Sequence, residues 1–255
     1  MQITFLGTGT SQGVPVIACD CAVCRSSDSR DQRLRSSVVI EIRDKKFVVD
    51  CGPDFRQQML REKISSIDAI FITHAHKDHI SGLDDVRSFN YFLQKPTDVY
   101  TSGVVRRVIE QEFSYAFEKN PYPGVPEINL KLFGNKKFFI QDIEIIPIKA
   151  IHYEPDQFVY GFRINDFTYL TDVLKIPEEE KKKIFGTKIL VLNALRKVKH
   201  YSHLNLDQAA ALIKEIGPEK GFITHISHQM GTHRDVEMEL PIGIQLAYDG
   251  LKIQL

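Results

Sequence analysis

The sequence predicts an α+β protein, with helices packed on mainly antiparallel or mixed β-sheets. Three observations favour this class. Hydrophobic residues make up 43% of the 255 residues, which is enough for a large core. Hairpin patterns rich in β-branched residues occur in both halves of the chain, with helical patterns between them. Neither a low-complexity linker nor an internal repeat divides the sequence, so we expect a single domain over residues 1–255.

The predicted elements mix strands and helices along the chain. Runs of β-branched and aromatic residues predict strands, and two such runs around a short turn predict a hairpin. The predicted strands and hairpins span residues 2–7, 36–50, 67–73, 136–150, 157–172, 188–195 and 221–227, with two short strands after them. The predicted helices span residues 54–64, 103–117, 177–185 and 205–216.

The last predicted helix has the clearest boundary signals. Asn205 can cap its start, and Gln208 completes a variant of the capping box. Gly217 is placed to end it. By contrast, residues 85–130 read as the most irregular region, and we expect this segment to form a lid or rim.

Composition and charge narrow the classes of partner and location. The 33 Lys and Arg residues balance the 33 Asp and Glu residues, which argues against a large nucleic-acid ligand but leaves a local basic patch open. No run of about 18 apolar residues predicts a membrane span. The amino-terminal stretch lacks signal-peptide features, so we expect a cytoplasmic protein, where clustered cysteines more often bind metal than form disulfides.

The stretch THAHKDH places four ligand-type side chains directly after an apolar strand. They are His74, His76, Asp78 and His79. Imidazole and carboxylate groups are ligands of zinc-type metals, and four of them in six residues can serve two ions. A histidine taken singly is more often a solvated or satisfied residue. Four such residues after a buried strand favour a metal site instead.

Four ligands do not complete two coordination spheres, so further ligands must come from other strand ends. His152, Asp172 and His225 each follow an apolar strand, as His74 does. If these strands lie side by side, their ends converge on one edge. A single Asp at a strand end would be weak evidence because Asp often opens turns. The recurrence of the pattern is what favours a shared metal site.

Three of the four cysteines form a second cluster, ACDCAVC, which ends at Cys24. Cys19, Cys21 and Cys24 offer soft thiolate ligands, but a closed zinc site needs a fourth ligand. The alternative is a reduced loop that binds no metal. The remaining cysteine, Cys51, reads as a small buried residue.

These motifs together resemble the metallo-β-lactamase family, whose fold is a four-layer αββα sandwich. THAHKDH matches the HxHxDH signature of that family, and FLGTGTSQGVP and Asp50 extend the resemblance along the chain. The resemblance implies two catalytic divalent metals. It assigns His74, His76 and His152 to one ion, Asp78, His79 and His225 to the other, and Asp172 as a bridge between them.

A narrower resemblance points to the phosphodiesterase branch, in particular to the phosphoribosyl 1,2-cyclic phosphate phosphodiesterases of phosphonate breakdown. It rests on ACDCAVC, SGLDDVRSFN, SHLNLDQAAALI and THISHQMG. In that branch a late histidine joins the three cysteines around a structural zinc, and by position this is His228. The zinc would brace the pocket wall rather than take part in the chemistry.

The chemistry implied is hydrolysis of a small phosphodiester, with a cyclic phosphate as the best single substrate. A hydroxide bridging the two metals would attack phosphorus in line. Asp78 is both a ligand and a group that can orient or deprotonate the water. His203, just before a helix start, is the candidate general acid or phosphate clamp. Arg87 and His200 are candidate substrate contacts, with an ion pair from Arg87 to Asp84 as the structural alternative.

Three rival functions stay open at this point. A tRNA 3′-processing endonuclease shares the fold, but we find no glycine- and lysine-rich arm of the kind that grips tRNA. A β-lactam or thioester hydrolase usually lacks the cysteine triplet. A non-catalytic binding protein on the same fold would usually show degraded metal ligands, and none is degraded here. The catalytic pair could hold zinc or manganese, and the resemblance also implies a possible homodimer.

Overall fold

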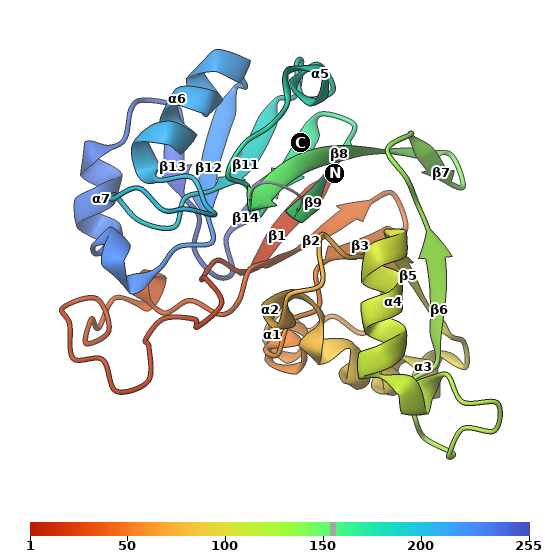
Figure 1. Cartoon of the computed structure of the whole chain (residues 1–255). Helices are drawn as coiled ribbons and strands as arrows, with labels where there is room; N and C mark the ends of the chain where they lie inside the picture. The colour runs from red at the N-terminus through yellow and green to blue at the C-terminus, as the bar shows by residue number, and fades with distance from the viewer. Residues whose placement is uncertain (154–156) are drawn as a thin grey trace. The chain divides into compact units, whose positions relative to one another are not determined.

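The computed structural model describes residues 1–153 and 157–255 and groups them into two compact units. The first unit comprises Met1–Gly7, Arg35–Gly134 and Gly250–Leu255, and the second comprises Thr8–Leu34 and Asn135–Asp249. Each unit contains one seven-stranded sheet with helices of its own (Figure 1). The single domain expected from the sequence stays a prediction.

The sheet of the first unit is mixed. Its strands run in the order β14-β1-β2-β3-β4-β5-β6, antiparallel up to β3 and parallel from β3 to β6. The strands are β1 (Gln2–Gly7), β2 (Ser37–Ile42), β3 (Lys45–Val49), β4 (Ala69–Phe71), β5 (Thr97–Thr101), β6 (Ile128–Leu132) and β14 (Lys252–Gln254). The helices are α1 (Phe55–Arg61), α2 (Lys77–Ile80), η2 (Ser81–Val86), α3 (Arg87–Leu93), α4 (Gly103–Glu112) and η3 (Ser114–Ala116).

The hydrophobic pattern of the first unit explains how it presents the THAHKDH stretch. The predicted hairpin forms between β2 and β3, and Arg43 takes φ 56° in the turn. Every residue of β4 is buried. Ile70 packs in an apolar cluster with side chains of α1, η2 and α4, and the ring of Phe71 contacts the rings of Phe47 and Tyr100. The chain stays buried through His74, so the polar stretch begins at the carboxyl end of a fixed strand.

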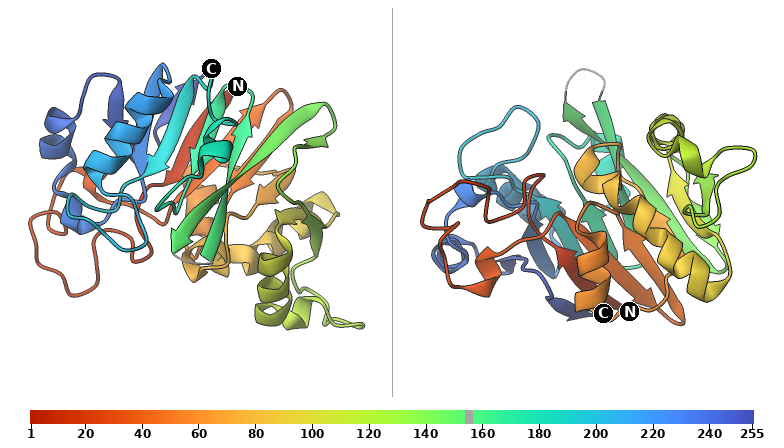
Figure 2. Two further views of the ribbon diagram at one scale, coloured as in Figure 1. Left: turned by 45° about the horizontal axis from the view of Figure 1, so that its top comes forward. Right: turned by 90° about the horizontal axis from the view of Figure 1, so that it is seen from below.

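The sheet of the second unit is also mixed. Its order is β13-β12-β11-β10-β9-β8-β7, parallel from β10 to β13 and antiparallel elsewhere. Figure 2 shows the long antiparallel pair of β8 and β9. The strands are β7 (Phe138–Ile140), β8 (Ile143–Tyr153), β9 (Gln157–Ile164), β10 (Phe167–Leu170), β11 (Ile189–Asn193), β12 (Lys220–Thr224) and β13 (Ile244–Leu246). The helices are η1 (Ser29–Asp31), α5 (Glu178–Lys181), α6 (Leu206–Ile216), η4 (His228–Met230) and α7 (His233–Glu239).

Helix α6 confirms the boundary signals in the sequence. The side chain of Asn205 accepts from the backbone N–H of Gln208, and Gln208 reaches back to the N–H of Asn205 at 3.0 Å. Gly217 ends the helix with φ 71°, in the left-handed region that glycine adopts without strain. Helix α6 contacts β11, and buried apolar residues of both elements belong to one core cluster. This helix therefore holds a fixed position beside the strand that leads into residues 194–205.

The expectation that residues 85–130 are irregular is wrong for most of the segment. It contains α3, β5, α4, η3 and the start of β6, and its longest stretch without a helix or strand is residues 117–127. β5 escaped prediction because it is short, although its burial alternates as a half-buried strand should. The helix expected at 177–185 is shorter than predicted. α5 spans Glu178–Lys181, and residues 182–186 form turns. The role of 85–130 as a lid or rim stays a prediction.

The first and last residues of the described chain are hydrogen-bonded to each other. The backbone N–H of Leu255 donates to the carbonyl of Met1 at 2.9 Å, and the amino group of Met1 donates to the carbonyl of Leu255 at 2.8 Å. Among the described residues, we find no helix with the length and apolar character to cross a membrane.

Candidate metal centres

A loop of the second unit gathers three cysteines around one histidine. Residues 16–28 form no helix or strand and contain Cys19, Cys21 and Cys24, all with free thiols. His228 begins η4, shortly after β12. The four ligand atoms all lie within 4.8 Å of one another. The structure thus brings together the four residues that the sequence and the resemblance assign to a structural zinc.

The distances in this cluster fit a tetrahedral zinc ion. Nδ1 of His228 lies 3.2, 3.5 and 3.6 Å from Sγ of Cys19, Cys21 and Cys24. With Zn–S bonds of about 2.3 Å and Zn–N bonds of about 2.0 Å, a tetrahedron has S···N edges of about 3.5 Å. Four protein ligands fill all positions of such a site. The cluster therefore suits a structural ion rather than one that must bind water.

Two of these thiols have opposite pKa shifts. The backbone N–H of Cys24 and the ring of His228 lower the pKa of Cys21 to about 6. Burial raises the pKa of Cys24 to about 11. Zinc binds the thiolate form, so Cys21 is the better prepared ligand of the two at neutral pH.

The THAHKDH stretch of the first unit forms two pairs of adjacent ligand atoms. Nε2 of His74 lies 3.0 Å from Nδ1 of His76. Nε2 of His79 lies 3.1 Å from Oδ2 of Asp78. Two nitrogen or oxygen ligands on one tetrahedral zinc are about 3.3 Å apart, so each pair fits a separate ion. The nitrogen and oxygen donors also suit zinc or manganese chemically.

Asp50 and Thr73 orient two of these histidines. The carboxylate of Asp50 accepts from Nδ1–H of His79 at 2.7 Å and from the hydroxyl of Thr73 at 2.9 Å. Since that hydroxyl donates to Asp50, its oxygen accepts from Nδ1–H of His74, 2.9 Å away. Burial raises the pKa of Asp50, and His79 opposes this shift. Both histidines thus present Nε2 as the ligand atom.

The second unit contributes three predicted ligands from its strand ends. His152 lies near the end of β8, Asp172 follows β10 and His225 follows β12 directly. Nδ1 of His225 lies 3.0 Å from Oδ1 of Asp172. Nδ1–H of His152 donates to the carbonyl of Ser202 at 2.9 Å, which leaves Nε2 as its ligand atom. His225 takes φ 56°, a strained conformation of the kind found at functional sites.

His203 lies among the predicted ligands of the second unit. Its Nε2 is 3.5 Å from Oδ2 of Asp172, and its ring stacks on His225 with centroids 5.1 Å apart. The ring of His152 meets it edge-on at 4.8 Å. Nδ1 of His203 lies 2.8 Å from Oγ of Ser202. These contacts leave the imidazole little freedom to rotate.

His200 extends the same cluster outward. Its Nδ1 lies 3.2 Å from Nδ1 of His203, and its ring stacks on Tyr201 at a centroid distance of 4.2 Å. Burial, followed by the nearby His203, lowers the pKa of His200. The prediction that His200 contacts substrate stays a prediction.

Arg87 pairs with Asp84, the alternative that the sequence analysis left open. Asp84 in turn accepts from the hydroxyl of Tyr115 at 2.6 Å. The guanidinium lies at the start of α3 and remains half-exposed, with 52% of the side chain accessible. A substrate contact by Arg87 would have to compete with this ion pair.

Sequence reasoning missed the residues that contact the predicted ligands of the second unit. Oγ1 of Thr10 lies 3.3 Å from Nε2 of His225. Asn193 holds both backbone groups of Val173, with its Oδ1 accepting from the N–H at 2.6 Å and its Nδ2 donating to the carbonyl at 3.0 Å. Val173 adjoins Asp172, so this clamp fixes the ligand. The available signal was a polar side chain ending the otherwise apolar strand β11.

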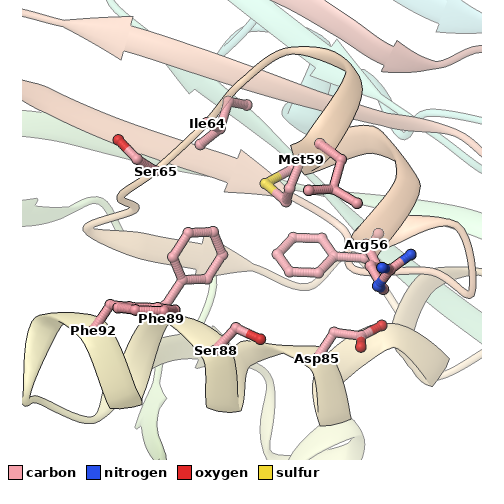
Figure 3. A pocket seen from close by; sticks show the side chains of 10 residues that line it. Arg56, Met59, Ile64, Ser65, Asp85, Ser88, Phe89 and Phe92 are labelled. Atoms are coloured by element: carbon pink, nitrogen blue, oxygen red, sulfur yellow. The ribbon is translucent and has the colours of Figure 1, made fainter.

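The first unit has a large apolar pocket whose lining shares no residue with the predicted ligands. It has a volume of about 590 Å³ and lies between α1, the turn after it, η2 and α3. Phe89 and Met59 point into the pocket, and Arg56 and Asp85 lie at one end (Figure 3). Leu60 and Phe92 also line it and remain largely exposed.

Comparison with known proteins defines the class of the chain. The family model of the β-lactamase superfamily domain matches residues 45–226. The chain therefore belongs to the β-lactamase superfamily. It has the α+β metallo-β-lactamase fold, which confirms the fold class predicted from the sequence.

Two closer likenesses specify the branch. The crystal structure of a diphosphatase from the PhnP family matches with a TM-score of 0.92 and 38% identity, covering 100% of this chain and 97% of that one. This places the chain in the PhnP branch of the fold. An octanoyltransferase of Porphyromonas gingivalis is 38% identical over 256 residues, covering 99% of this chain but 51% of that protein. The chain thus spans about half the length of this curated relative.

More distant likenesses extend over the whole chain. A ribonuclease Z of Methanococcus maripaludis is 24% identical over 265 residues, covering 100% of this chain and 69% of that protein. A zinc-bound PqqB structure from Methylobacterium extorquens matches with a TM-score of 0.82 at 17% identity, covering 100% of both chains. At that identity the likeness shows the fold alone.

Proposed function

We propose that the chain is a metal-dependent phosphodiesterase that hydrolyses a small diester, a cyclic phosphate being the first candidate. The coarser class, a hydrolase of the metallo-β-lactamase fold related to a PhnP-family diphosphatase, supports phosphoryl chemistry. The donor set supports the metal requirement. Imidazole and carboxylate ligands suit two divalent ions of the zinc or manganese type.

The proposed ligand assignment follows the pairs of adjacent donor atoms. His74, His76 and His152 hold one ion. Asp78, His79 and His225 hold the second, and Asp172 bridges the two. The support is that His74 and His76 form one close pair, that Asp78 and His79 form another, and that Asp172 lies against His225.

The residues of this chain then have distinct tasks. When bound, the two ions would lower the pKa of a coordinated water and offset charge on the phosphate oxygens. Asp78 orients that water and accepts its proton. As the water oxygen bonds to phosphorus, the bond from phosphorus to the leaving oxygen breaks. Protonated His203 gives its Nε2 proton to that oxygen, which leaves a monoester and an alcohol.

The observation that carries this proposal is the setting of His203. Its Nε2 lies 3.5 Å from Oδ2 of the proposed bridging ligand Asp172, while Ser202 and His200 hold its Nδ1 side. A proton donor fixed beside a metal bridge suits protonation of a leaving group. A histidine with a purely structural role would have no need to face that carboxylate.

The test is hydrolysis of bis-p-nitrophenyl phosphate by protein loaded with zinc or manganese. We expect His76→Ala and Asp172→Ala to abolish activity, and His203→Ala to lower kcat by about 100-fold or more with metal content retained. Lys77→Ala, an exposed neighbour of the ligands, is the control and should keep full activity. Equal activity in the wild type and the three variants would refute the proposal. Binding of a single zinc per chain would favour a non-catalytic protein.

The ribonuclease Z likeness keeps an RNA substrate as the second candidate. A tRNA precursor in place of the small diester separates the two. Specific cleavage at the tRNA 3′ end, without hydrolysis of small diesters, would favour the endonuclease over the small-diester phosphodiesterase.

We also propose that the protein is cytoplasmic, because its four free cysteines suit a reducing compartment.

We also propose a homodimer that forms through the α1–α3 pocket. The side chain of Phe92 is exposed beside the apolar cavity. The oppositely charged side chains of Arg56 and Asp85 lie at one end of the pocket (Figure 3). A surface that carries both a protruding side chain and a cavity, and both signs of charge, can be complementary to itself and pair with a second copy around a two-fold axis.

Light scattering should give a dimer for the wild type and a monomer for Phe92→Asp. Phe139→Asp, an exposed aromatic on β7, should stay dimeric. A monomeric wild type would contradict the proposal.

A further inference from the structure

A row of aromatic rings in the second unit leads from the proposed ligands to the surface. Tyr153 ends β8 directly after His152, and Tyr201 lies two residues before His203. Their rings meet edge to face, with centroids 5.8 Å apart and an interplanar angle of 85°. Both are exposed, Tyr153 to 47% and Tyr201 to 72%.

The ring of Tyr201 has one face covered by a neighbouring ring and the other face exposed. The ring of His200 stacks on it at 4.2 Å with an interplanar angle of 30°, which covers one face. Tyr153 meets it edge to face. Because Tyr201 still exposes 72% of its surface, its second face is open to solvent. A flat ring held by two others forms a fixed platform.

The loop that carries Tyr201 is held by its own hydrogen bonds. The N–H of Leu195 donates to the carbonyl of Leu204 at 3.0 Å, which closes the loop at its base. The side chain of Asn205 donates to the carbonyl of Lys197 at 2.9 Å. Ser202, next in the chain, contacts both His200 and His203. A group that docks on the platform would therefore not have to order the loop first.

Such a platform has a recognised chemical partner. Nucleobases stack on exposed aromatic side chains, and each stacked base contributes about 1–3 kcal/mol by alanine substitution. Single exposed aromatic residues are common and need no function. Tyr201 differs from those because its ring is backed, its loop is fixed, and it lies two residues from the proposed proton donor His203.

We propose that Tyr201, supported by Tyr153, stacks on a nucleobase of the substrate, so that the diester is a nucleoside phosphodiester rather than a base-free sugar phosphate. This inference rests on the proposed function, because it takes the phosphate to lie among the proposed metal ligands. It assigns Tyr201 a part in specificity and leaves the bond-breaking steps to Asp78 and His203.

The test compares two five-membered cyclic phosphates that differ in the base. Adenosine 2′,3′-cyclic phosphate carries one, and glycerol 1,2-cyclic phosphate does not. We expect Tyr201→Ser to lower kcat/KM for the adenosine substrate by about 5- to 150-fold, mainly through KM, which corresponds to the stacking free energy of one base. The glycerol substrate should change less than about twofold, which is below the smallest stacking effect.

Two further variants separate the ring from the rest of the side chain. Tyr201→Phe keeps the ring and should keep the preference for the adenosine substrate. Tyr122→Ser removes an equally exposed tyrosine of the first unit and should change neither rate. Circular dichroism confirms that each variant is folded. Equal losses on both substrates in Tyr201→Ser would overturn the inference, because the residue would then act through His203 and not on a base.

A binding measurement keeps this test independent of turnover. Calorimetry compares adenosine 5′-monophosphate with ribose 5-phosphate on metal-loaded protein. We expect the adenosine ligand to bind more tightly to the wild type, and this advantage to disappear in Tyr201→Ser. If it persists in that variant, the platform is refuted. If it disappears while no diester is hydrolysed by any form, stacking stands and the proposed phosphodiesterase activity fails.

Discussion

Asp50 contacts two of the proposed ligand histidines without being assigned to a metal itself. It accepts directly from His79, and through the Thr73 hydroxyl it fixes the ring of His74. Such outer partners set the tautomer and orientation of a ligand histidine. The buried position of Asp50 leaves no solvent to replace these bonds when the carboxylate is altered.

We expect Asp50→Asn to weaken metal binding by about 10- to 100-fold, the usual effect of losing such a partner. The amide can present its N–H to His79, so the ring is no longer held with Nε2 free for metal. Competition with a chelator measures the affinity. Asp44→Asn changes an exposed acid on the β2–β3 turn and should leave the affinity unchanged. Unaltered affinity in Asp50→Asn would show that Asp50 does not position the ligands.

His233 makes the stability of the second unit depend on pH. Burial, followed by the adjacent Arg33, lowers the pKa of His233 to about 4 from its ordinary 6.5. NH2 of Arg33 lies 3.1 Å from Nδ1 of His233, and NH1 donates to Thr8 and to the carbonyl of Ala247. Between pH 6.5 and 4 the unfolded chain binds a proton that the folded chain does not.

The free energy of unfolding should therefore fall as the pH falls through this window, by at most about 1.4 kcal/mol per pH unit from this one group. Above pH 6.5 the contribution is fully present. Urea denaturation of the wild type and of His233→Gln at pH 7 and pH 5 measures it. The wild type should lose more stability between the two pH values than the variant. Equal losses would place the pKa of His233 near its ordinary value.

The candidate metal ligands could be identified from the sequence, but the residues that orient them could not. His74, His76 and His79 stand in one short motif after one strand, so local spacing is sufficient to find them. Thr73 binds His74 through a network that also needs Asp50, 23 residues away. Such a partnership depends on β3 and β4 being neighbours in the sheet, which no local pattern encodes.

At the level of elements, the cysteine loop has no regular structure to hold it. Residues 16–28 instead converge on His228 through Cys19, Cys21 and Cys24. A bound zinc would replace the missing backbone ladder with four coordinate bonds. The free energy of metal binding would then be part of the folding free energy of this segment.

We expect Cys21→Ser to lower the zinc content by one ion per chain and to lower Tm. The serine hydroxyl is a much poorer zinc ligand than the thiolate that Cys21 supplies. Metal analysis by mass spectrometry and a thermal scan measure the two effects. Ile17→Ser, at a position of the same loop that is 96% exposed, should change neither. Unchanged zinc content in Cys21→Ser would refute the structural site.

Elements with strong local signals were predictable, and short ones were not. α6 carries a capping box and a terminal glycine, so its limits could be read from sequence. α3 follows η2 without a cap from a side chain, and α7 spans only seven residues after Thr232. β6 lies beside a proline-rich stretch that masked it. These elements are stabilised by packing against the sheets rather than by their own propensity.

On the scale of the whole molecule, the balance of charge limits the affinity for RNA. Binding of a nucleic acid draws most of its free energy from phosphate contacts by Lys and Arg, and 33 acidic residues offset the 33 basic ones here. The run from Arg196 to Lys199 is a local exception, but Lys197 is already paired with Glu239 at 2.6 Å.

We expect tRNA to bind with a dissociation constant of about 1 µM or weaker at physiological salt, and to weaken further as salt rises. A filter-binding assay over a series of salt concentrations measures both quantities. Lys199→Glu should reduce the residual binding. Lys137→Glu, at the residue directly before β7, is the control and should not. Nanomolar binding that resists salt would favour the endonuclease over the small-diester enzyme.

The fold class was predictable because it depends on pattern summed over the chain. Hairpins at β2–β3, β7–β8 and β9–β10 were visible as paired apolar runs around turns. The parallel half of each sheet was not, since β10 and β11 pair across an intervening segment that contains α5. Local sequence defines the strands, while long-range packing decides their neighbours.

The bonded ends of the first unit make the chain a candidate for circular permutation. β14 pairs with β1, and Met1 and Leu255 exchange two backbone hydrogen bonds (Figure 1). A short glycine linker could join these residues without breaking the sheet. New ends opened between the exposed Pro123 and Gly124 would lie in a turn outside every strand and helix. Such a permutant would keep all seven proposed metal ligands, with His152, Asp172 and His225 now preceding His74, His76, Asp78 and His79 along the chain.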